Sequence, residues 1–261
     1  MEYHELRNDL EAVGARVAEL LDAATSPDQP VAGSDWTVNQ VAAHLVELTR
    51  RYRDAIGGDS EPFPRLDGST HAGMAGRNAR SLTPLRDTAV ESFRDDAGAL
   101  LDALGRDGER VIPWFETRAT LHEVAGVWLG EMLLHGLDVA RTLDRAWPIS
   151  RAQAAQVFFG IRPMLPLVAR EAVARSLAPA TLHLKLRGEA DYTVAVTNDG
   201  VTVEAGAPAR PDVSVSASPV AYLLVGYGRK SQWAAIARGQ ITAWGRKPWL
   251  ALKFAELFEN P

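Results

Sequence analysis

The sequence predicts a multi-domain chain in which an antiparallel four-helix bundle is followed by an α+β domain. Up to about residue 148, apolar residues recur three or four positions apart, which is the period of an amphipathic helix. From Ala180 onwards they alternate with polar residues, which is the period of a strand. This change of period predicts a bundle over residues 1–148, a helical junction over 149–179 and an α+β domain over 180–261.

Composition narrows the range of functions. The 261 residues carry a formal net charge of −5 and include no Cys. Because no block of basic residues is present, we expect neither nucleic acid nor a membrane surface as a partner. Any thiol chemistry would need a thiol from outside the chain. The N-terminus lacks a signal-peptide pattern and no apolar run approaches the roughly 20 residues that span a bilayer, so we expect a cytoplasmic protein. Separately, we expect a monomer.

The first two helices are marked by apolar spacing and by a capping motif. Residues 2–23 carry apolar side chains at helical spacing, namely Leu6, Leu10, Val13, Val17 and Leu20. Thr37 and Gln40 form a capping box, which marks the start of the second helix. The apolar stripe of this helix consists of Val41, Leu45 and Leu48. His44 lies on the same face, so we expect its imidazole to point into the core.

A long irregular segment, residues 57–83, separates the second helix from the third. A segment of this length inside a compact domain is typical of a functional or mobile loop. It contains Arg77, Asn78 and Arg80, which could bind an anionic ligand or form a solvated cluster of charge.

The third and fourth helices also have recognisable starts. Thr83 followed by Pro84 is typical of an N-cap with proline at the first helical position. After an extended bridge over residues 109–115, Thr120 and Glu123 form a second capping box. Four helices joined mostly by short connections predict an antiparallel bundle, whose interior is a common place for a metal site.

The rest of the chain predicts helices and then a sheet. Residues 150–176 read as one or two helices interrupted by Pro163 and Pro166. Strands are expected over 181–188, over both arms of a hairpin within 191–206 that turns at Asn198-Asp199-Gly200, over 212–218 and over 240–245. Helices are expected over 218–228, 230–239 and 247–258.

A candidate metal site links the second and fourth helices. Glu131 and His135 are four residues apart, which places a carboxylate and an imidazole one turn apart on one face. With His44 as a third ligand, the set leaves a fourth position open, which suits catalytic zinc, and iron or nickel bind the same ligand types. Asp138 follows three residues after His135, where it could orient that imidazole.

Spacing alone leaves a second interpretation open. His44 and His135 could be core histidines satisfied by Glu131 and Asp138, because an acid and a His four residues apart are common on helices. The metal interpretation requires the two imidazoles, which are distant in sequence, to lie within about 8 Å of each other.

The motifs on these two helices resemble a known family. SDWTVNQVAAHLVEL at residues 34–48 and GEMLLHGLDVARTL at residues 130–143 are similar to the mycothiol-dependent maleylpyruvate isomerase family, a branch of the DinB-like metal-binding bundles. The resemblance covers roughly residues 5–147 and includes, more loosely, the RNAR segment at 77–80. From about Thr181 the chain resembles the sterol-carrier-type domain that is often fused to this bundle.

The resemblance implies a zinc site, a thiol cosubstrate and a set of site residues. The metal, for which nickel or iron are also possible, would be bound by His44, Glu131 and His135. Mycothiol or a related low-molecular-weight thiol would be the cosubstrate, and the implied cofactor-binding residues are Arg77, Asn78 and Arg80. Apart from the resemblance, the helix spacing leads us to expect that Asp138 orients a ligand. We also expect Arg246, at a turn where relatives often have an acidic residue, to supply a cation for a small electrophilic substrate, which would then be anionic.

The family chemistry leaves two reactions open, and a different class of function stands beside them. The thiolate could isomerise a cis double bond of the maleylpyruvate type, or it could remain attached to an electrophile, as in a transferase. The alternative is a non-catalytic protein whose C-terminal domain binds a small apolar ligand or lipid. This alternative is suggested by the aromatic residues of the C-terminal domain, namely Tyr222, Tyr227, Trp233, Trp244 and Trp249. At helix and strand spacings, however, such residues are typical of core packing.

Overall fold

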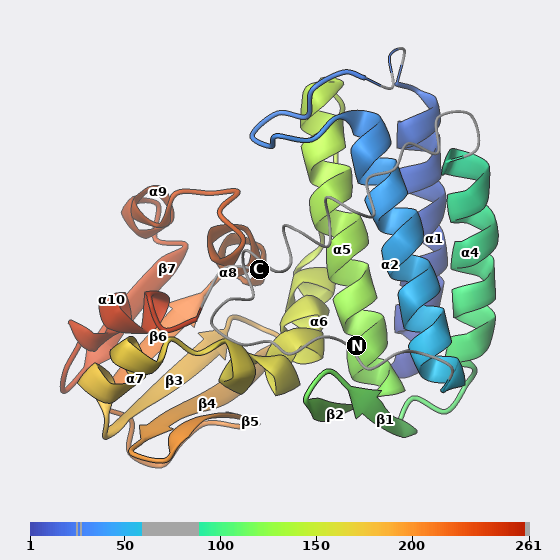
Figure 1. Cartoon of the computed structure of the whole chain (residues 1–261). Coiled ribbons are helices and arrows are strands. Elements are labelled where there is room, and N and C mark those ends of the chain that lie inside the picture. The colour runs from blue at the N-terminus through green and yellow to red at the C-terminus, as the bar shows by residue number, and fades with distance from the viewer. Residues whose placement is uncertain (25, 27, 59–88, 259–261) are drawn as a thin grey trace. The chain divides into compact units, whose positions relative to one another are not determined.

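A computed structural model of the chain describes residues 1–24, 26, 28–58 and 89–258. Contacts divide the chain into two compact units, with the boundary between Ile149 and Ser150. Figure 1 shows long helices in the first unit and a sheet with shorter helices in the second. The predicted fold class, a helical part followed by an α+β part, is therefore confirmed, while the finer division at residues 148 and 179 stays a prediction.

The first unit is the predicted four-helix bundle, and its helices are α1 (Tyr3–Asp22), α2 (Val38–Gly57), α4 (Ala89–Leu104) and α5 (Leu121–Thr142). Helix α1 packs against α4 and α5, and α2 packs against the same two helices (Figure 1). The capping boxes at Thr37 and Thr120 are both formed. The predicted start of the third helix at Thr83 lies outside the described residues.

Helices α2 and α5 are held in register by a buried hydrogen bond. The indole Nε1 of Trp128 donates to Thr49 Oγ1 at 3.2 Å, and this hydroxyl donates in turn to the carbonyl oxygen of Leu45 at 2.7 Å. Trp128 lies one turn before Glu131, and Thr49 lies just over one turn after His44. The bond therefore fixes how the two helices meet next to the candidate ligands.

A small hairpin precedes α5. Strand β1 (Val111–Trp114) pairs antiparallel with β2 (Thr117–Thr120), and Phe115 in the turn takes a left-handed conformation with a φ of 51°. The sequence predicts the first strand as an extended bridge but not the second. The reason is that TRAT is short and lacks the apolar alternation by which a strand is recognised.

The second unit is built on a five-stranded sheet of order β5-β4-β3-β6-β7, in which β3 and β6 are parallel and the other neighbours antiparallel. Its strands are β3 (Ala180–Leu186), β4 (Ala190–Thr197), β5 (Gly200–Ala205), β6 (Val213–Ala217) and β7 (Ile241–Gly245). Its helices are α6 (Arg151–Ile161), η1 (Arg162–Val168), α7 (Glu171–Leu177), α8 (Pro219–Gly226), α9 (Gln232–Ala237) and α10 (Leu250–Ala255). All the strands and helices expected from Ala180 onwards are present.

One face of this sheet forms the core of the second unit. Leu182, Leu184 and Leu186 of β3 pack in a cluster that also contains Phe158 of α6 and Phe254 of α10. The expectation that the aromatic residues of this unit pack in its core is wrong for three tryptophans. Trp233 is 61 % exposed, Trp244 is 49 % exposed and Trp249 is 62 % exposed. Among the described helices, none is both long and apolar enough to cross a membrane.

Gly136 of α5 is required by the close approach of Trp147. A Cβ atom at position 136 would lie 2.2 Å from Cζ2 of Trp147, whose Nε1 donates to the carbonyl oxygen of Leu133 at 2.9 Å. The guanidinium of Arg16 lies 4.2 Å from the centroid of the same indole. The first turn after His135 is therefore covered by a side chain from beyond the end of the helix.

We expect Gly136→Ala to destabilise the protein by about 1–3 kcal/mol, because the indole must move and lose its contacts. In a protein that also carries Trp147→Ala, the effect of Gly136→Ala on stability should reverse. The alanine at position 136 should then stabilise the protein by about 0.5–1 kcal/mol, because alanine has a higher helix propensity than glycine. Urea unfolding of the two single variants and the double variant gives this cycle. A destabilisation of equal size in both backgrounds would show that the indole is not the cause.

Candidate metal centre

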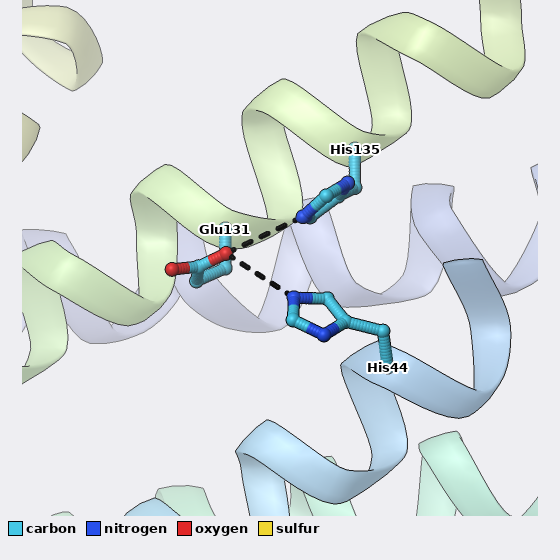
Figure 2. A group of neighbouring side chains, drawn as sticks. All are labelled: His44, Glu131 and His135. Carbon is cyan, nitrogen blue, oxygen red and sulfur yellow. Dashed lines mark ion pairs between the residues drawn. The ribbon is translucent and has the colours of Figure 1, made fainter. Parts of the chain in front are cut away.

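Helices α2 and α5 bring together three side chains that can bind a metal. Figure 2 shows His44 of α2 facing Glu131 and His135 of α5. Glu131 Oε2 lies 3.8 Å from His44 Nε2 and 3.5 Å from His135 Nε2. The centroids of the two imidazole rings are 4.9 Å apart, within the required 8 Å. One potential ligand atom of each residue lies within 4.8 Å of those of the other two.

These distances fit a shared cation better than hydrogen bonds between the side chains. A hydrogen bond between nitrogen and oxygen measures about 2.7–3.2 Å, and both distances from Glu131 Oε2 are longer. Two atoms bound tetrahedrally to one zinc at about 2.1 Å lie about 3.4 Å from each other, which is close to what is observed. Two imidazoles and a carboxylate are also ligand types that zinc, iron and nickel accept. The residues present therefore fit a divalent metal.

The electrostatics of the cluster favour the forms of these groups that bind cations. Burial lowers the pKa of His44, although its interaction with Glu131 acts in the opposite direction. The imidazole therefore stays neutral to a lower pH than an exposed histidine does. Burial alone would raise the pKa of Glu131, but its interactions with His135 and His44 lower it to about 2. At neutral pH the site therefore offers an ionised carboxylate and a neutral His44 imidazole, as metal binding requires.

We expect metal affinity to fall in acid, where protons compete for the His44 imidazole, and because burial lowers the pKa of His44 this loss should begin below the ordinary histidine range. Glu131 stays ionised down to a pH of about 2, so acid releases the metal through the imidazoles and not through the carboxylate. Competition with a chelating dye, measured from pH 8 down to pH 5, should show a Kd for the metal that rises as the pH falls. An affinity that does not change over this range would contradict histidine ligation.

Trp36 covers both imidazoles. Its indole stacks on the ring of His135 with centroids 5.7 Å apart and planes 15° apart, and it lies tilted against His44 at 4.9 Å. From the sequence we expect Asp35-Trp36 to supply only a helix entry and a core aromatic residue. The position of Trp36 could have indicated that it lies near the site, because Trp36 directly precedes the capping residue of the helix that carries His44.

The segment that carries Trp36 is anchored on itself and on α5. The Val31 N–H donates to the Trp36 carbonyl oxygen at 2.8 Å, and the Trp36 N–H donates to Ser34 Oγ at 3.1 Å. The Ala32 N–H donates to Thr142 Oγ1 at 2.8 Å, and this hydroxyl donates to the Asp138 carbonyl oxygen at 3.0 Å. The sequence analysis does not predict this role of Thr142. The loop is thus fixed to the last turns of the helix that carries two of the candidate ligands.

Thr142→Val should loosen this loop while keeping the shape of the side chain. Loss of the bond from Ala32 should cost about 1 kcal/mol locally, which corresponds to about fivefold faster amide exchange. Hydrogen exchange measured by mass spectrometry on a peptide that contains Ala32 tests this. Thr142→Ser keeps the hydroxyl and serves as the control, and equal exchange in both variants would show that the hydroxyl does not anchor the loop.

The other predicted site residues have different surroundings. Asp138 is buried, with 6 % exposure, one turn beyond His135 on α5, and its orienting role stays a prediction. Arg246 belongs to the second unit, where its Nη2 donates to Asp212 Oδ1 at 2.8 Å, and its role towards a substrate also stays a prediction. The three residues predicted to bind a cofactor lie outside the described residues: Arg77, Asn78 and Arg80.

Comparisons with known proteins extend this picture. The family model described as "Mycothiol maleylpyruvate isomerase N-terminal domain" matches residues 9–140, half of the chain, and this range contains all three candidate ligands. No curated protein sequence matches.

Solved structures show a similar fold over nearly the whole chain. The crystal structure of the mycothiol-dependent maleylpyruvate isomerase is 13 % identical with a TM-score of 0.53, and the match covers 93 % of each chain. A mutant of that enzyme gives the same values. Sterol Carrier Protein 2 from Yarrowia lipolytica is 20 % identical over 41 % of this chain and 96 % of its own, with a TM-score of 0.30. Because residues 9–140 match the family model, the chain belongs to the mycothiol maleylpyruvate isomerase N-terminal domain family.

Proposed function

We propose that this protein is a zinc-dependent enzyme that uses mycothiol, or a related small thiol, to isomerise a cis double bond in a small substrate of the maleylpyruvate type. The observation that carries the proposal is the convergence of His44, Glu131 and His135 within the segment that defines the family. A cytoplasmic location and a monomeric state belong to the same proposal.

The residues of the centre suit the activation of a thiol. A divalent metal bound there would attract the thiol sulfur and favour the thiolate, which is the reactive form. His44, Glu131 and His135 together carry one negative charge, so the centre with its metal keeps a net positive charge for an anionic ligand. Trp36 covers the imidazoles and limits the access of water to them. Because the chain has no Cys, the thiol must come from solution.

The proposed reaction returns the thiol unchanged. The thiolate adds to one carbon of the cis double bond, the electron pair of the broken π bond moves onto the neighbouring carbonyl group as an enolate, and the resulting C–C single bond rotates. The C–S bond then breaks, the thiolate leaves, and the trans double bond forms. In the transferase version the new C–S bond persists, the neighbouring carbon takes up a proton from solvent, and the product carries the thiol. The two versions share the same first step, so the product distinguishes them.

Product analysis tests the proposal. The full chain, loaded with zinc, is incubated with mycothiol and maleylpyruvate, and the products are separated and weighed by mass spectrometry. A trans product with the mass of the substrate supports isomerisation, and a product heavier by one thiol supports S-transfer. If neither forms faster than without the protein, the proposed activity is wrong for this substrate and thiol.

The lipid-binding alternative is favoured by one observation, the exposure of Trp233, Trp244 and Trp249 on the second unit. Exposed aromatic residues are typical of surfaces that contact apolar ligands or partners. Organic extraction of the natively purified protein followed by mass spectrometry tests this function. A stoichiometric lipid would support it, and an empty extract together with thiol-dependent turnover would exclude it as the main role.

A further inference from the structure

The imidazoles of the candidate metal centre are not oriented by hydrogen bonds within the described part of the chain. In metal sites, a histidine ligand commonly donates the N–H of its second ring nitrogen to a carboxylate or a carbonyl oxygen, which fixes the direction of the ring. Here the Nε2 atoms of His44 and His135 face Glu131 (Figure 2), so the two Nδ1 atoms would take this role. Neither Nδ1 atom has a hydrogen bond to a described residue. The direction of the two rings must therefore come from other contacts.

Three aromatic rings pack together at the centre, and Trp36 contributes the largest of them. Its indole lies nearly parallel to the His135 imidazole, with planes 15° apart and centroids 5.7 Å apart. It is tilted by 57° against the His44 imidazole at 4.9 Å, and the two imidazoles meet edge to face at 4.9 Å. Offset or tilted rings with centroids about 4.5–7 Å apart are the favoured geometries of aromatic pairs. Each ring contacts the other two, so rotation of either imidazole away from Glu131 would disturb two contacts.

The indole is positioned by its backbone more than by burial, because Trp36 is only partly buried. The Val31 N–H donates to the Trp36 carbonyl oxygen at 2.8 Å, and the Trp36 N–H donates to Ser34 Oγ at 3.1 Å. The next residue, Thr37, caps the helix that carries His44. The backbone is thus fixed on both sides of Trp36, and its ring can direct the imidazoles.

A metal ion at the centre would strengthen the contact between Trp36 and His135. A divalent cation withdraws electron density from an imidazole that binds it, so the imidazole ring gains partial positive charge. The face of an indole carries partial negative charge and attracts positive groups that lie over it. A contact that is stronger with metal than without it raises the affinity for the metal. For a contact of this kind the gain is up to about tenfold.

We propose that Trp36 positions the ligands of the metal centre: its indole holds the imidazoles of His44 and His135 with their Nε2 atoms towards Glu131, in place of hydrogen bonds to the Nδ1 atoms. This inference rests on the metal-binding part of the proposed function and not on the reaction. Trp36 acts on the metal only through the two imidazoles. Its replacement should therefore weaken metal binding, and another aromatic ring at this position should restore most of the affinity.

The zinc affinity of the full chain tests this role. Trp36→Leu removes the ring but keeps an apolar side chain, and Trp36→Phe keeps a smaller ring. Competition with a chelating dye should show binding about tenfold weaker for Trp36→Leu and less than about threefold weaker for Trp36→Phe. Trp233→Leu, which replaces an exposed tryptophan of the second unit, is the control and should bind zinc as the unchanged protein does. Circular dichroism shows whether each variant folds, and Trp36→Met replaces Trp36→Leu if the latter does not.

Urea unfolding separates this role from simple packing. The stability of the unchanged protein and of Trp36→Leu is measured without metal and with the same saturating concentration of zinc. If the indole acts on the ligands, Trp36→Leu should lose more stability with zinc than without it, by the amount that corresponds to the tenfold loss of affinity. Equal losses in the two states, or equal zinc affinities of Trp36→Leu and Trp233→Leu, would show that Trp36 only packs against the rings.

Asp138→Asn tests the competing way to orient His135, in which a carboxylate one turn along α5 accepts a hydrogen bond from its Nδ1. If Asp138→Asn weakens zinc binding and Trp36→Leu does not, the assignment to Trp36 is wrong although the metal centre stands. If the Trp36 variants bind zinc as expected but no thiol is turned over, the proposed reaction fails and the role of Trp36 stands. If the unchanged protein binds no zinc, both proposals fail.

Discussion

His135→Ala should leave the purified protein with less than about a tenth of an equivalent of bound metal, where the unchanged protein holds about one. The variant removes one of three ligands, and a carboxylate with a single imidazole binds a divalent ion weakly. Thiol-dependent turnover should fall with the metal, by more than about 100-fold. Elemental analysis of dialysed protein and a turnover assay on the same samples give the two numbers.

A histidine outside the cluster supplies the control for this prediction. His183 of β3 hydrogen-bonds Asp191 Oδ1 through its Nε2 at 2.7 Å, within the second unit. His183→Ala should retain the metal, and circular dichroism should show that both variants fold. If His135→Ala fails to fold, His44→Ala removes the partner ligand from the other helix and serves in its place. Full metal occupancy in a folded ligand variant would mean that the metal, if any, binds elsewhere.

Glu131→Gln should weaken metal binding by about 100-fold or more, although the side chain keeps its size. Glu131 is the one charged ligand, and its pKa of about 2 reflects how strongly the two imidazoles favour the ionised form. The neutral amide gives up this charge and binds zinc poorly. Because both imidazoles remain, an excess of zinc should restore part of the turnover.

The matched control for Glu131→Gln is Glu47→Gln. Glu47 lies on α2 and pairs with Arg51 at 3.1 Å at the surface, so its replacement should alter neither metal affinity nor turnover. Titration with zinc in the presence of a competing dye measures the affinities of both variants. If Glu131→Gln binds zinc as tightly as Glu47→Gln, Glu131 is not a ligand. His44 and His135 would then be core histidines that only pair with acidic side chains.

Much of the fold could be predicted because local signals and packing agree. The capping boxes at Thr37 and Thr120 begin their helices where the sequence places them, since each satisfies backbone N–H groups that have no partner within the helix. The alternation in residues 181–188 and 191–206 gives strands whose apolar side faces one core. The order of strands in the sheet and the pairing of β1 with β2 depend on contacts between distant segments, which periodicity does not encode.

The candidate site was predictable where its residues share a helix and less so elsewhere. The spacing of Glu131 and His135 fixes their common face, and the position of His44 in an apolar stripe directs it into the core. That Trp36 would cover both rings could not be predicted. Its position depends on a loop held by hydrogen bonds to Ser34 and, through Ala32, to Thr142, and such bonds between loop and helix leave no periodic trace in the sequence.

X-ray absorption at the zinc edge, recorded on the full chain with and without mycothiol, tests the central claim most directly. The account predicts two imidazoles and one carboxylate around the metal, with no sulfur before the thiol is added and one sulfur at about 2.3 Å afterwards. Because the chain contains no Cys, a sulfur that appears only with mycothiol must come from the thiol. A spectrum without imidazole scattering, or one that mycothiol does not change, would contradict the account.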